Sequence, residues 1–157
     1  MSTPEYCSQC SWLFDKMGAC RPPEASIIFS LASFLPYLII FLFIGLSISI
    51  RTQRQVKMAL LLITCYIVGD RILKNVFQSP RPDEACKKSY GFPSSHMTVI
   101  CCYALGIWFN CKKSQKAFLI VMVVLQGFAR VQLKYHTWEQ VLGGVFFAII
   151  YTLIFES

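Results

Sequence analysis

The chain has 157 residues, of which 55% are hydrophobic and only 15% are charged, and its mean hydropathy is +0.53. Soluble domains carry about 25% charged residues, so this chain has too few charges to cover a soluble globule, and a disordered or fibrous protein is excluded as well. The net charge of +7 suits cytosolic loops or an anionic ligand better than nucleic acid, because the rest of the chain is so apolar. We therefore expect a protein of the lipid bilayer that does not bind nucleic acid.

The first apolar segment defines a boundary near residue 25. Residues 1–25 are polar, and Pro22-Pro23-Glu24 marks the start of a helix, because Pro is tolerated in the first turn and an acid suits its positive end. Ile27–Ile50 is uncharged over 24 residues, which is long enough to span a bilayer with some tilt, and Pro36 is expected to kink it. We predict an N-terminal non-cytosolic segment (residues 1–25) and a single membrane-embedded domain (residues 26–157).

Four further apolar segments follow, covering Met58–Gln78, about Ser94–Asn110, Ala117 to about Lys134, and Thr137–Phe155. Together the segments predict an all-α, polytopic membrane bundle of about five transmembrane helices. Short linkers make neighbouring helices alternate in direction, so the two basic loops fall on one face, which the positive-inside rule makes cytosolic. The basic residues of these loops are Arg51, Arg54, Lys57, Lys112, Lys113 and Lys116.

The ionisable residues at the opposite, non-cytosolic edge form a set that suits phosphate. They comprise three cations and both histidines of the protein: Lys74, Arg81, Arg130, His96 and His136. Ionisable side chains near the hydrocarbon are costly and point to a function. Arg offers two donors to phosphate oxygens, whereas Lys supplies a point charge.

Local spacing supports this interpretation at the first cations and at the two serines. Lys74 and Arg81 are seven residues apart, about two helical turns, and share a face if the helix continues toward Pro80. Ser94 and Ser95 precede an apolar run, as helix N-caps do, and the free backbone N–H groups there bind anions.

His136 and Gln140 are four residues apart on the fifth predicted helix and therefore share a face. We expect Gln140 to orient the His136 ring by a hydrogen bond.

Each residue also has a plainer interpretation. Lys74 can simply pair with Asp70 one turn earlier, the two serines can act only as a helix cap, and His136 can belong to an interfacial aromatic belt. Lys87 and Lys88 are best explained as a solvated face, with recruitment of an anionic head group as the alternative. The joint spacing of the set, rather than any single residue, indicates a site.

Seven of the eight cysteines fall into two groups, inside apolar runs or in polar segments. Those inside apolar runs, such as Cys65 and Cys101, behave as small hydrophobes. Cys7-x-x-Cys10 resembles half of a zinc site, but no second pair or His lies near it, so the ligand spacing is incomplete.

Three stretches together resemble the signature of the type 2 phosphatidic acid phosphatase superfamily of membrane phosphatases, relatives of the vanadium haloperoxidases. That signature is a Lys followed seven residues later by Arg-Pro, then Pro-Ser-Gly-His, then Ser-Arg with a His six residues after the Arg and an Asp four further. The resemblance covers about residues 58–150. The matching stretches here are Lys74 to Arg81-Pro82, Pro93-Ser94-Ser95-His96, and Ala129-Arg130 to His136 and Gln140.

Within the superfamily the sequence is most similar to the dolichyl diphosphatases, in Leu73–Val76, Tyr90–His96 and Tyr135–Trp138. Those enzymes remove the terminal phosphate of dolichyl diphosphate at the lumenal face of the endoplasmic reticulum and return dolichyl phosphate for N-glycosylation. They also carry Ser rather than Gly in the second motif.

Two positions depart from the superfamily pattern. Ala129 replaces a Ser and removes a hydroxyl near the phosphate. Gln140 replaces an Asp, and an amide can fix the imidazole tautomer but cannot stabilise its cationic form as a carboxylate does. The dolichyl branch resembles this chain at Gln140, so we interpret the Gln as a feature of the branch.

The resemblance implies a role for each site residue. His136 would be the nucleophile that forms a phosphohistidine, oriented by Gln140, and His96 the general acid that protonates the leaving dolichyl phosphate. Neither a metal nor a cofactor is implied. The residues implied to bind the phosphoryl oxygens are Lys74, Arg81, Ser94, Ser95 and Arg130.

A lumenal site would place the cysteines of the polar segments in an oxidising compartment, where they can form up to two disulfides. Their spacing leaves the pairing open. These cysteines are Cys7, Cys10, Cys20 and Cys86.

Other functions fit parts of the pattern. One is a phosphatase for another lipid phosphate or a shorter isoprenoid diphosphate. Another is an inactive membrane scaffold, which Gln140 favours. An anion channel is disfavoured, because its cations would run through the membrane midplane rather than gather at one edge. Oligomeric state and lipid tail length are not determined by these residues.

Overall fold

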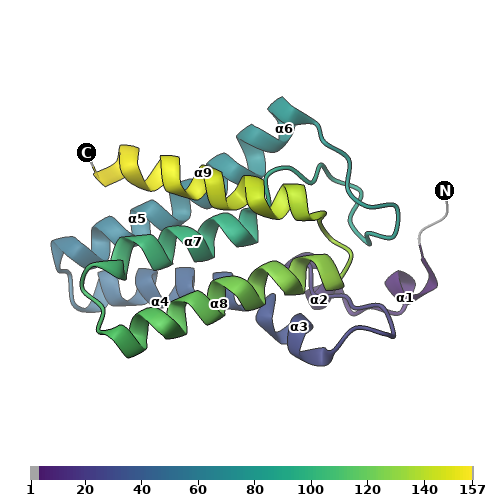
Figure 1. Cartoon of the computed structure of the whole chain (residues 1–157), viewed down its shortest axis with the longest axis horizontal. Coiled ribbons are helices and arrows are strands. Elements are labelled where there is room, and N and C mark those ends of the chain that lie inside the picture. Colours follow the sequence, from purple (N-terminus) through teal and green to yellow (C-terminus); the bar gives the residue numbers. More distant parts are fainter. Residues whose placement is uncertain (1–3, 157) are drawn as a thin grey trace.

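The computed structural model describes residues 4–156, and all regular structure in that range is helical (Figure 1). Five long helical segments form a bundle, counting α3 with α4 and α5 with η1 and α6, as the sequence predicted. The elements are α1 (Glu5–Ser8), α2 (Trp12–Met17), α3 (Ile27–Ala32), α4 (Leu35–Ser49), α5 (Gln53–Ile67), the π-helix η1 (Val68–Leu73), α6 (Lys74–Phe77), α7 (Ser95–Trp108), α8 (Lys113–Gln132) and α9 (Trp138–Glu156).

Helix α7 is the centre of the bundle and packs against α9, α5 and α8. Small residues allow these approaches. A Cβ at Gly144 of α9 would lie 2.8 Å from the Ser94 carbonyl oxygen and 3.0 Å from Met97 Cβ, so α9 touches the beginning of α7 through bare backbone. This contact fixes the start of α7, where the second motif lies, against the start of α9.

The outer surface of the bundle is apolar. Phe41 on α4, Val121 on α8 and Phe146 on α9 are each more than 60% exposed. A helix that is apolar on all sides is either buried in protein or spans a membrane. Among the described residues 4–156, three helices are long and apolar enough to cross a bilayer: Ile27–Ser49, Lys113–Gln132 and Trp138–Phe155.

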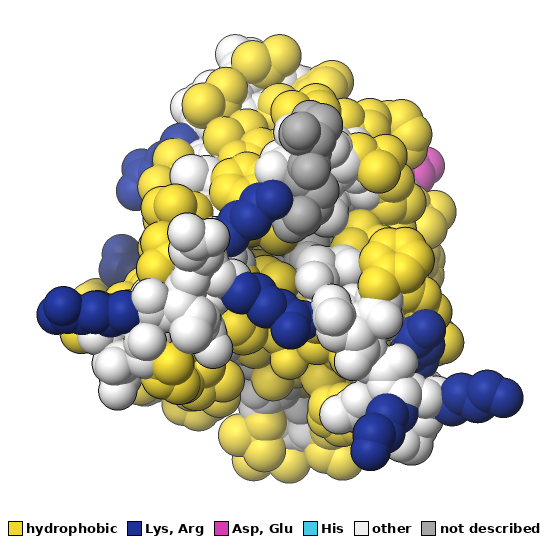
Figure 2. Space-filling view, turned by 90° about the vertical axis from the view of Figure 1, so that its left-hand side faces the viewer, with side chains coloured by type: hydrophobic (Ala, Val, Ile, Leu, Met, Phe, Trp, Pro, Cys, Tyr) yellow, Lys and Arg dark blue, Asp and Glu magenta, His cyan; other side chains and the backbone are white. Residues whose placement is uncertain are grey.

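Basic side chains gather at one end of the bundle, where α4 meets α5 and α7 meets α8 (Figure 2). Arg51, Arg54, Lys112 and Lys113 are exposed there. Both basic segments therefore lie at the same end, as the alternation of helices predicted.

Two helices, α5 and α8, begin earlier than the hydropathy predicted. α5 starts at Gln53, where the Thr52 hydroxyl accepts from Gln55 N at 3.4 Å, so Arg54 and Lys57 are helical rather than in a loop. α8 likewise begins at Lys113. Hydropathy locates the edge of the apolar surface, whereas Arg, Lys and Gln are good helix formers and extend the helix beyond it.

The first span breaks between α3 and α4, at Ser33 and Phe34, and Pro36 occupies the first turn of α4. The predicted kink is therefore confirmed as a break in the helix. Proline fits there because the first N–H groups of a helix have no intrahelical partner.

The second helix does not continue toward Pro80, so the condition under which Lys74 and Arg81 would share a helix face is not met. α6 ends at Phe77, and Gln78 takes a left-handed conformation with φ 48° while its N–H donates to Lys74 O at 3.0 Å. Ser79 precedes a proline and is biased away from helical geometry. Arg81 therefore reaches the site from a loop and not from the helix face that carries Lys74.

The N-terminal segment is covalently tied to the loop between α6 and α7. Cys7 is bonded to Cys86 and Cys10 to Cys20, which gives the pairing that the spacing left open and excludes a zinc site at Cys7 and Cys10. A second small core contains Cys20 and Leu133, both nearly inaccessible to solvent. The segment therefore covers the end of the bundle opposite the basic one.

Candidate active site

The arrangement around His136 determines the tautomer of its ring. Nδ1 lies 3.1 Å from Gln140 Oε1, and Gln140 Nε2 donates to Pro80 O at 2.6 Å and to Ser79 Oγ at 3.2 Å. Because the amide nitrogen is used by these acceptors, the amide oxygen faces His136, and Nδ1 must carry the hydrogen. Nε2 is left with its lone pair. The predicted hydrogen bond between His136 and Gln140 is confirmed, although His136 itself lies just before α9.

Arg81 occupies the other side of the same ring. Its guanidinium donates to Tyr135 O at 2.6 Å and approaches His136 Nε2 at 3.1 Å, while its Nε donates to Ser89 O at 2.8 Å. Burial lowers the pKa of Arg81 to about 10, so it remains charged at neutral pH. Burial, followed by the positive charges of Arg81 and Arg130, holds the pKa of His136 well below 6.5. His136 is therefore neutral with its lone pair directed at a cation.

Lys74 pairs with Asp70, as its plainer interpretation predicted, and Asp70 also accepts from Ser95 Oγ at 3.0 Å. The lysine is 7% exposed and still lines the site cavity. Asp70 sits in the π-helix η1, a geometry often found at functional sites. Lys74 can therefore pair with Asp70 and still belong to the site.

The start of α7 carries the second motif. Ser94 is its N-cap by backbone position, but its hydroxyl caps no N–H and is buried without a hydrogen-bond partner. Its backbone N–H donates to Gln140 O at 3.0 Å. His96 follows, with Nε2 3.0 Å from Met17 O and its ring edge-on to Tyr37. A carbonyl can only accept, so Nε2 of His96 carries a hydrogen here.

Arg130 is 1% exposed. One guanidinium nitrogen donates to Gly18 O at 2.7 Å and to Ser33 Oγ at 2.9 Å, and the guanidinium lies over the Tyr135 ring at 4.7 Å. Its charge forms no ion pair with a residue that the structure describes.

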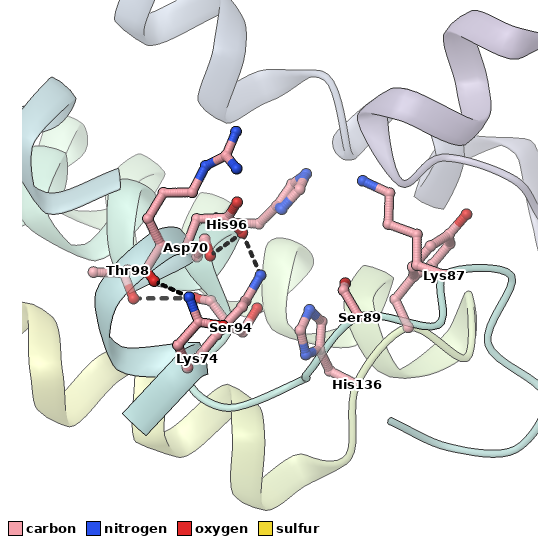
Figure 3. Close-up of polar contacts among 12 residues, drawn as sticks. Asp70, Lys74, Lys87, Ser89, Ser94, His96, Thr98 and His136 are labelled. Atoms are coloured by element: carbon pink, nitrogen blue, oxygen red, sulfur yellow. Dashed lines mark hydrogen bonds and ion pairs between the residues drawn. The ribbon is translucent and has the colours of Figure 1, made fainter. Parts of the chain in front are cut away.

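These groups enclose a polar cavity of about 70 Å³, several times the ~10–15 Å³ that one water requires. All three predicted cations and both histidines line it, whereas Ser94 and Ser95 do not. Figure 3 shows His96, Lys74, Lys87 and His136 facing one another around the space. The lining residues are Tyr37, Tyr66, Asp70, Lys74, Arg81, Lys87, Ser89, His96, Arg130 and His136.

The N-terminal segment contributes a feature that the sequence did not suggest. Three consecutive carbonyl oxygens accept from three donors of the site: Lys16 O from Lys87 at 2.8 Å, Met17 O from His96 at 3.0 Å and Gly18 O from Arg130 at 2.7 Å. We refer to these three oxygens as the carbonyl row. Backbone acceptors have no residue signature, and the only hint was Gly18, which takes a left-handed conformation with φ 63°.

The chemistry of this set is that of an oxyanion site. Cationic donors and two imidazoles surround a space lined by a single carboxylate, that of Asp70. Within residues 4–156, no three His, Cys, Asp or Glu side chains cluster as metal ligands.

Fold and site together define a class: an integral membrane helix bundle with a buried, cation-lined cavity at one end. The chain belongs to the PAP2 superfamily, whose family model matches residues 54–156. All of the predicted site residues fall within that range. None of the curated protein sequences compared with the chain matches it significantly.

Two solved structures share the fold. LpxE of Aquifex aeolicus superimposes with a TM-score of 0.70 and 25% identity, covering 92% of each chain. The PAP2-type phosphatidylglycerolphosphate phosphatase of Bacillus subtilis superimposes with a TM-score of 0.66 and 26% identity, covering 94% of this chain and 76% of that one. The bundle therefore has the fold of PAP2-type membrane phosphatases.

Proposed function

We propose that the protein is a metal-independent lipid-diphosphate phosphatase that hydrolyses dolichyl diphosphate to dolichyl phosphate and phosphate. The observation that carries this proposal is the state of His136. Gln140 fixes the hydrogen on Nδ1, and the Nε2 lone pair lies 3.1 Å from Arg81 inside a cavity lined by further cations. A neutral, oriented imidazole beside phosphate-binding cations is an activated nucleophile.

In the first step, Nε2 of His136 attacks the terminal phosphorus. The N–P bond forms as the bond from phosphorus to the bridging oxygen breaks, and its electron pair leaves with the lipid phosphate. Arg81, Lys74 and Arg130 stabilise the charge on the transferred group. The Nδ1–H of His136 remains bonded to Gln140, which supports the phosphohistidine.

His96 is proposed as the acid of the first step and the base of the second. In its protonated form, with hydrogens on both ring nitrogens, it gives the Nε2 proton to the leaving oxygen, is left neutral, and then takes a proton from the water that hydrolyses the N–P bond. Its Nε2–H donates to Met17 O in this structure, so protonation of the leaving group from Nε2 requires that hydrogen bond to open.

A lipid substrate fits the position of the site. Helix α7 has 14 residues and is about 21 Å long, shorter than the roughly 30 Å hydrocarbon core. Its N-terminus, with His96, therefore lies close to the head-group interface or slightly toward the centre of the bilayer from it. The apolar outer surface leaves the isoprenoid tail in the bilayer.

We propose that the site faces the lumen of the endoplasmic reticulum, where the protein supports N-glycosylation. The support is twofold. Both disulfides lie at the site end, which suits an oxidising compartment. The exposed loop residues Arg51, Arg54, Lys112 and Lys113 lie at the opposite end, as expected for a cytosolic face, while the site end also carries exposed Lys16, Arg21 and Lys88.

The second candidate is a phosphatase for another lipid phosphate, and the similarity to the Bacillus subtilis phosphatidylglycerolphosphate phosphatase favours it. An inactive scaffold is less well supported, because Gln140 orients His136 rather than leaving it unsupported.

The test is turnover by the purified protein, with a metal chelator present, on a panel of dolichyl diphosphate, phosphatidylglycerolphosphate and phosphatidic acid. We expect the fastest phosphate release from dolichyl diphosphate, loss of at least about 1,000-fold in His136→Ala, and a phosphorylated intermediate that His136→Ala lacks. Faster release from another lipid would select the second candidate. Equal, slow release by wild type and His136→Ala would reject an enzyme, and loss of activity in chelator would reject a metal-independent mechanism.

A further inference from the structure

We propose that Lys87 binds the second phosphate of a diphosphate head group, the one that leaves with the lipid, and so makes the cavity selective for diphosphates over monophosphates. This inference rests on the proposed function and adds a residue outside the three motifs of the superfamily signature.

Lys87 is fixed in position by its neighbour. Cys86 is bonded to Cys7, which anchors the loop at the residue before the lysine. The Lys87 side chain is half-buried and lines the cavity, whereas Lys88 is exposed. In Figure 3, Lys87 enters the space from the side opposite Lys74, with Ser89 and His136 near its base. The expectation of a solvated face is thus wrong for Lys87 and confirmed for Lys88.

The carbonyl row places Lys87 beside His96. Lys87 Nζ donates to Lys16 O at 2.8 Å, and His96 Nε2 donates to the next carbonyl, Met17 O, at 3.0 Å. Consecutive Cα atoms are ~3.8 Å apart, so the two donors reach neighbouring points at one side of the cavity. Arg81 lies 3.1 Å from His136 Nε2 and also bonds Ser89, in the same loop as Lys87. His96, the proposed acid, marks the leaving-group side of the cavity, and Lys87 is the cation beside it.

The charges match a diphosphate. Lys74 is neutralised by Asp70, while Arg81, Arg130 and Lys87 form no ion pair with any described residue. A phosphate monoester carries a charge of about −1.5 to −2 at neutral pH, which the two arginines balance, and a diphosphate adds one further negative oxygen for Lys87.

The lowered pKa of Lys87 indicates that no neighbouring negative charge balances its positive charge. Burial, followed by the nearby charges of Arg81 and Arg130, lowers its pKa to about 8. A bound anion would stabilise the charged form and raise that pKa. The binding of a second phosphate would therefore offset the repulsion between Lys87 and the two arginines.

A cation at this point also serves the reaction. When the bond between phosphorus and the bridging oxygen breaks, the electron pair stays on that oxygen, which becomes a terminal oxygen of the lipid monophosphate. Lys87 would stabilise the charge that develops there. A monophosphate lipid has an alkoxide leaving group and no second phosphate for Lys87 to hold.

The experiment compares kcat/KM on dolichyl diphosphate and dolichyl phosphate for wild type, Lys87→Met and the matched control Lys88→Met. We expect Lys87→Met to lose about 10- to 100-fold on the diphosphate and much less on the monophosphate, Lys87→Arg to keep most of the preference, and Lys88→Met to resemble wild type. An unchanged ratio of the two substrates in Lys87→Met, or an equal change in Lys88→Met, would overturn the proposal.

Two further measurements distinguish phosphate binding by Lys87 from a purely structural role, and from failure of the proposed function. Lys87→Gln keeps a donor for Lys16 O but removes the charge, so it should lose the diphosphate preference without a matching loss of thermal stability. Binding of the two lipids is also measured in His136→Ala, where no turnover is needed. The double variant with His136→Ala and Lys87→Met is compared with His136→Ala alone. Weaker diphosphate binding by the double variant supports the inference even if wild type turns over neither lipid, and unaltered binding rejects it.

Discussion

The amide oxygen of Gln140 holds His136, while the amide nitrogen holds the loop between α6 and α7. His136 Nδ1 lies 3.1 Å from Oε1, and Nε2 of the same amide donates to Pro80 O at 2.6 Å. A carboxylate could accept from His136 but would set its second oxygen against the Pro80 carbonyl. The amide therefore suits this loop at the position where the superfamily signature has Asp.

The first prediction follows from this double contact. Gln140→Glu should lower kcat/KM at neutral pH by at least about tenfold, because the glutamate loses both donor bonds and displaces the loop that carries Arg81. Protonation of the new carboxyl restores one donor, so activity should recover partly as the pH is lowered. Gln140→Leu, which loses acceptor and donor together, should fall by about 100-fold or more and not recover. Activity in Gln140→Glu at or above that of wild type would contradict the amide's proposed role.

The pH dependence of the reaction provides the second prediction. Burial and nearby positive charges hold the pKa of His136 well below 6.5, so the free enzyme should keep its nucleophile neutral down to pH values below 6.5. The acid limb of kcat/KM should lie there. Arg81→Gln removes a charge at 3.1 Å from Nε2 and should move this limb to higher pH, whereas Arg81→Lys should leave it nearly in place. A limb that moves equally in both variants would show that the charge of Arg81 does not set the pKa.

The same shift affects stability. The unfolded chain binds a proton at His136 near the ordinary pKa of 6.5, while the folded protein does not bind one until a lower pH. Between these two values the unfolded state holds more protons, so the free energy of unfolding should fall as the pH is lowered through that window. Thermal unfolding of His136→Ala should show a smaller dependence on pH below 6.5 than wild type.

The sequence predicted the residues of the site better than the backbone that holds them. Lys74, Arg81, His96, Arg130 and His136 could be found because phosphate chemistry restricts both residue type and spacing. The helix on which Arg81 could have shared a face with Lys74 ends at Phe77, and the left-handed conformation of Gln78 that ends it is one that glutamine does not itself favour.

The sequence offered binding of an anionic head group by Lys87 only as the alternative to a solvated face, and it gave no sign of the carbonyl row. A lysine next to Lys88 looks solvated until a disulfide at Cys86 positions it, and a backbone carbonyl has no residue signature. The pairing of Cys7 with Cys86 spans 79 residues, and no local pattern specifies such a contact.

The third prediction concerns Gly18 in the carbonyl row. Its φ is 63°, and a Cβ there would lie 3.0 Å from an Arg130 guanidinium nitrogen. Gly18→Ala should therefore cost about 1–2 kcal/mol in backbone strain and shift Arg130, lowering kcat/KM by about tenfold. Gly45→Ala is the matched control, since a Cβ there meets nothing within 4 Å and alanine favours the helix by about 0.5–1 kcal/mol. Equal activity in the two variants would mean that the row does not hold Arg130 in place.

The fourth prediction separates the two disulfides. In the chain-entropy description a longer closed loop stabilises more, about 4–5 kcal/mol for the Cys7–Cys86 separation of 79 residues against about 3 kcal/mol for the Cys10–Cys20 separation of 10. Replacing Cys7 and Cys86 by Ser should thus lower Tm more than replacing Cys10 and Cys20. Activity on dolichyl phosphate, which does not depend on Lys87, should fall more when Cys10 and Cys20 are replaced, at a temperature where all variants are folded. Cys20 lies two residues from Gly18 and holds the carbonyl row, whereas the longer bridge positions Lys87. Cys111→Ser removes a free thiol and should leave Tm and activity unchanged.

The contradicting outcome is a larger loss of both Tm and activity when Cys7 and Cys86 are replaced. The Cys10–Cys20 bridge would then not position the carbonyl row, and the loop bearing Lys87 would be the element that the disulfides hold for catalysis.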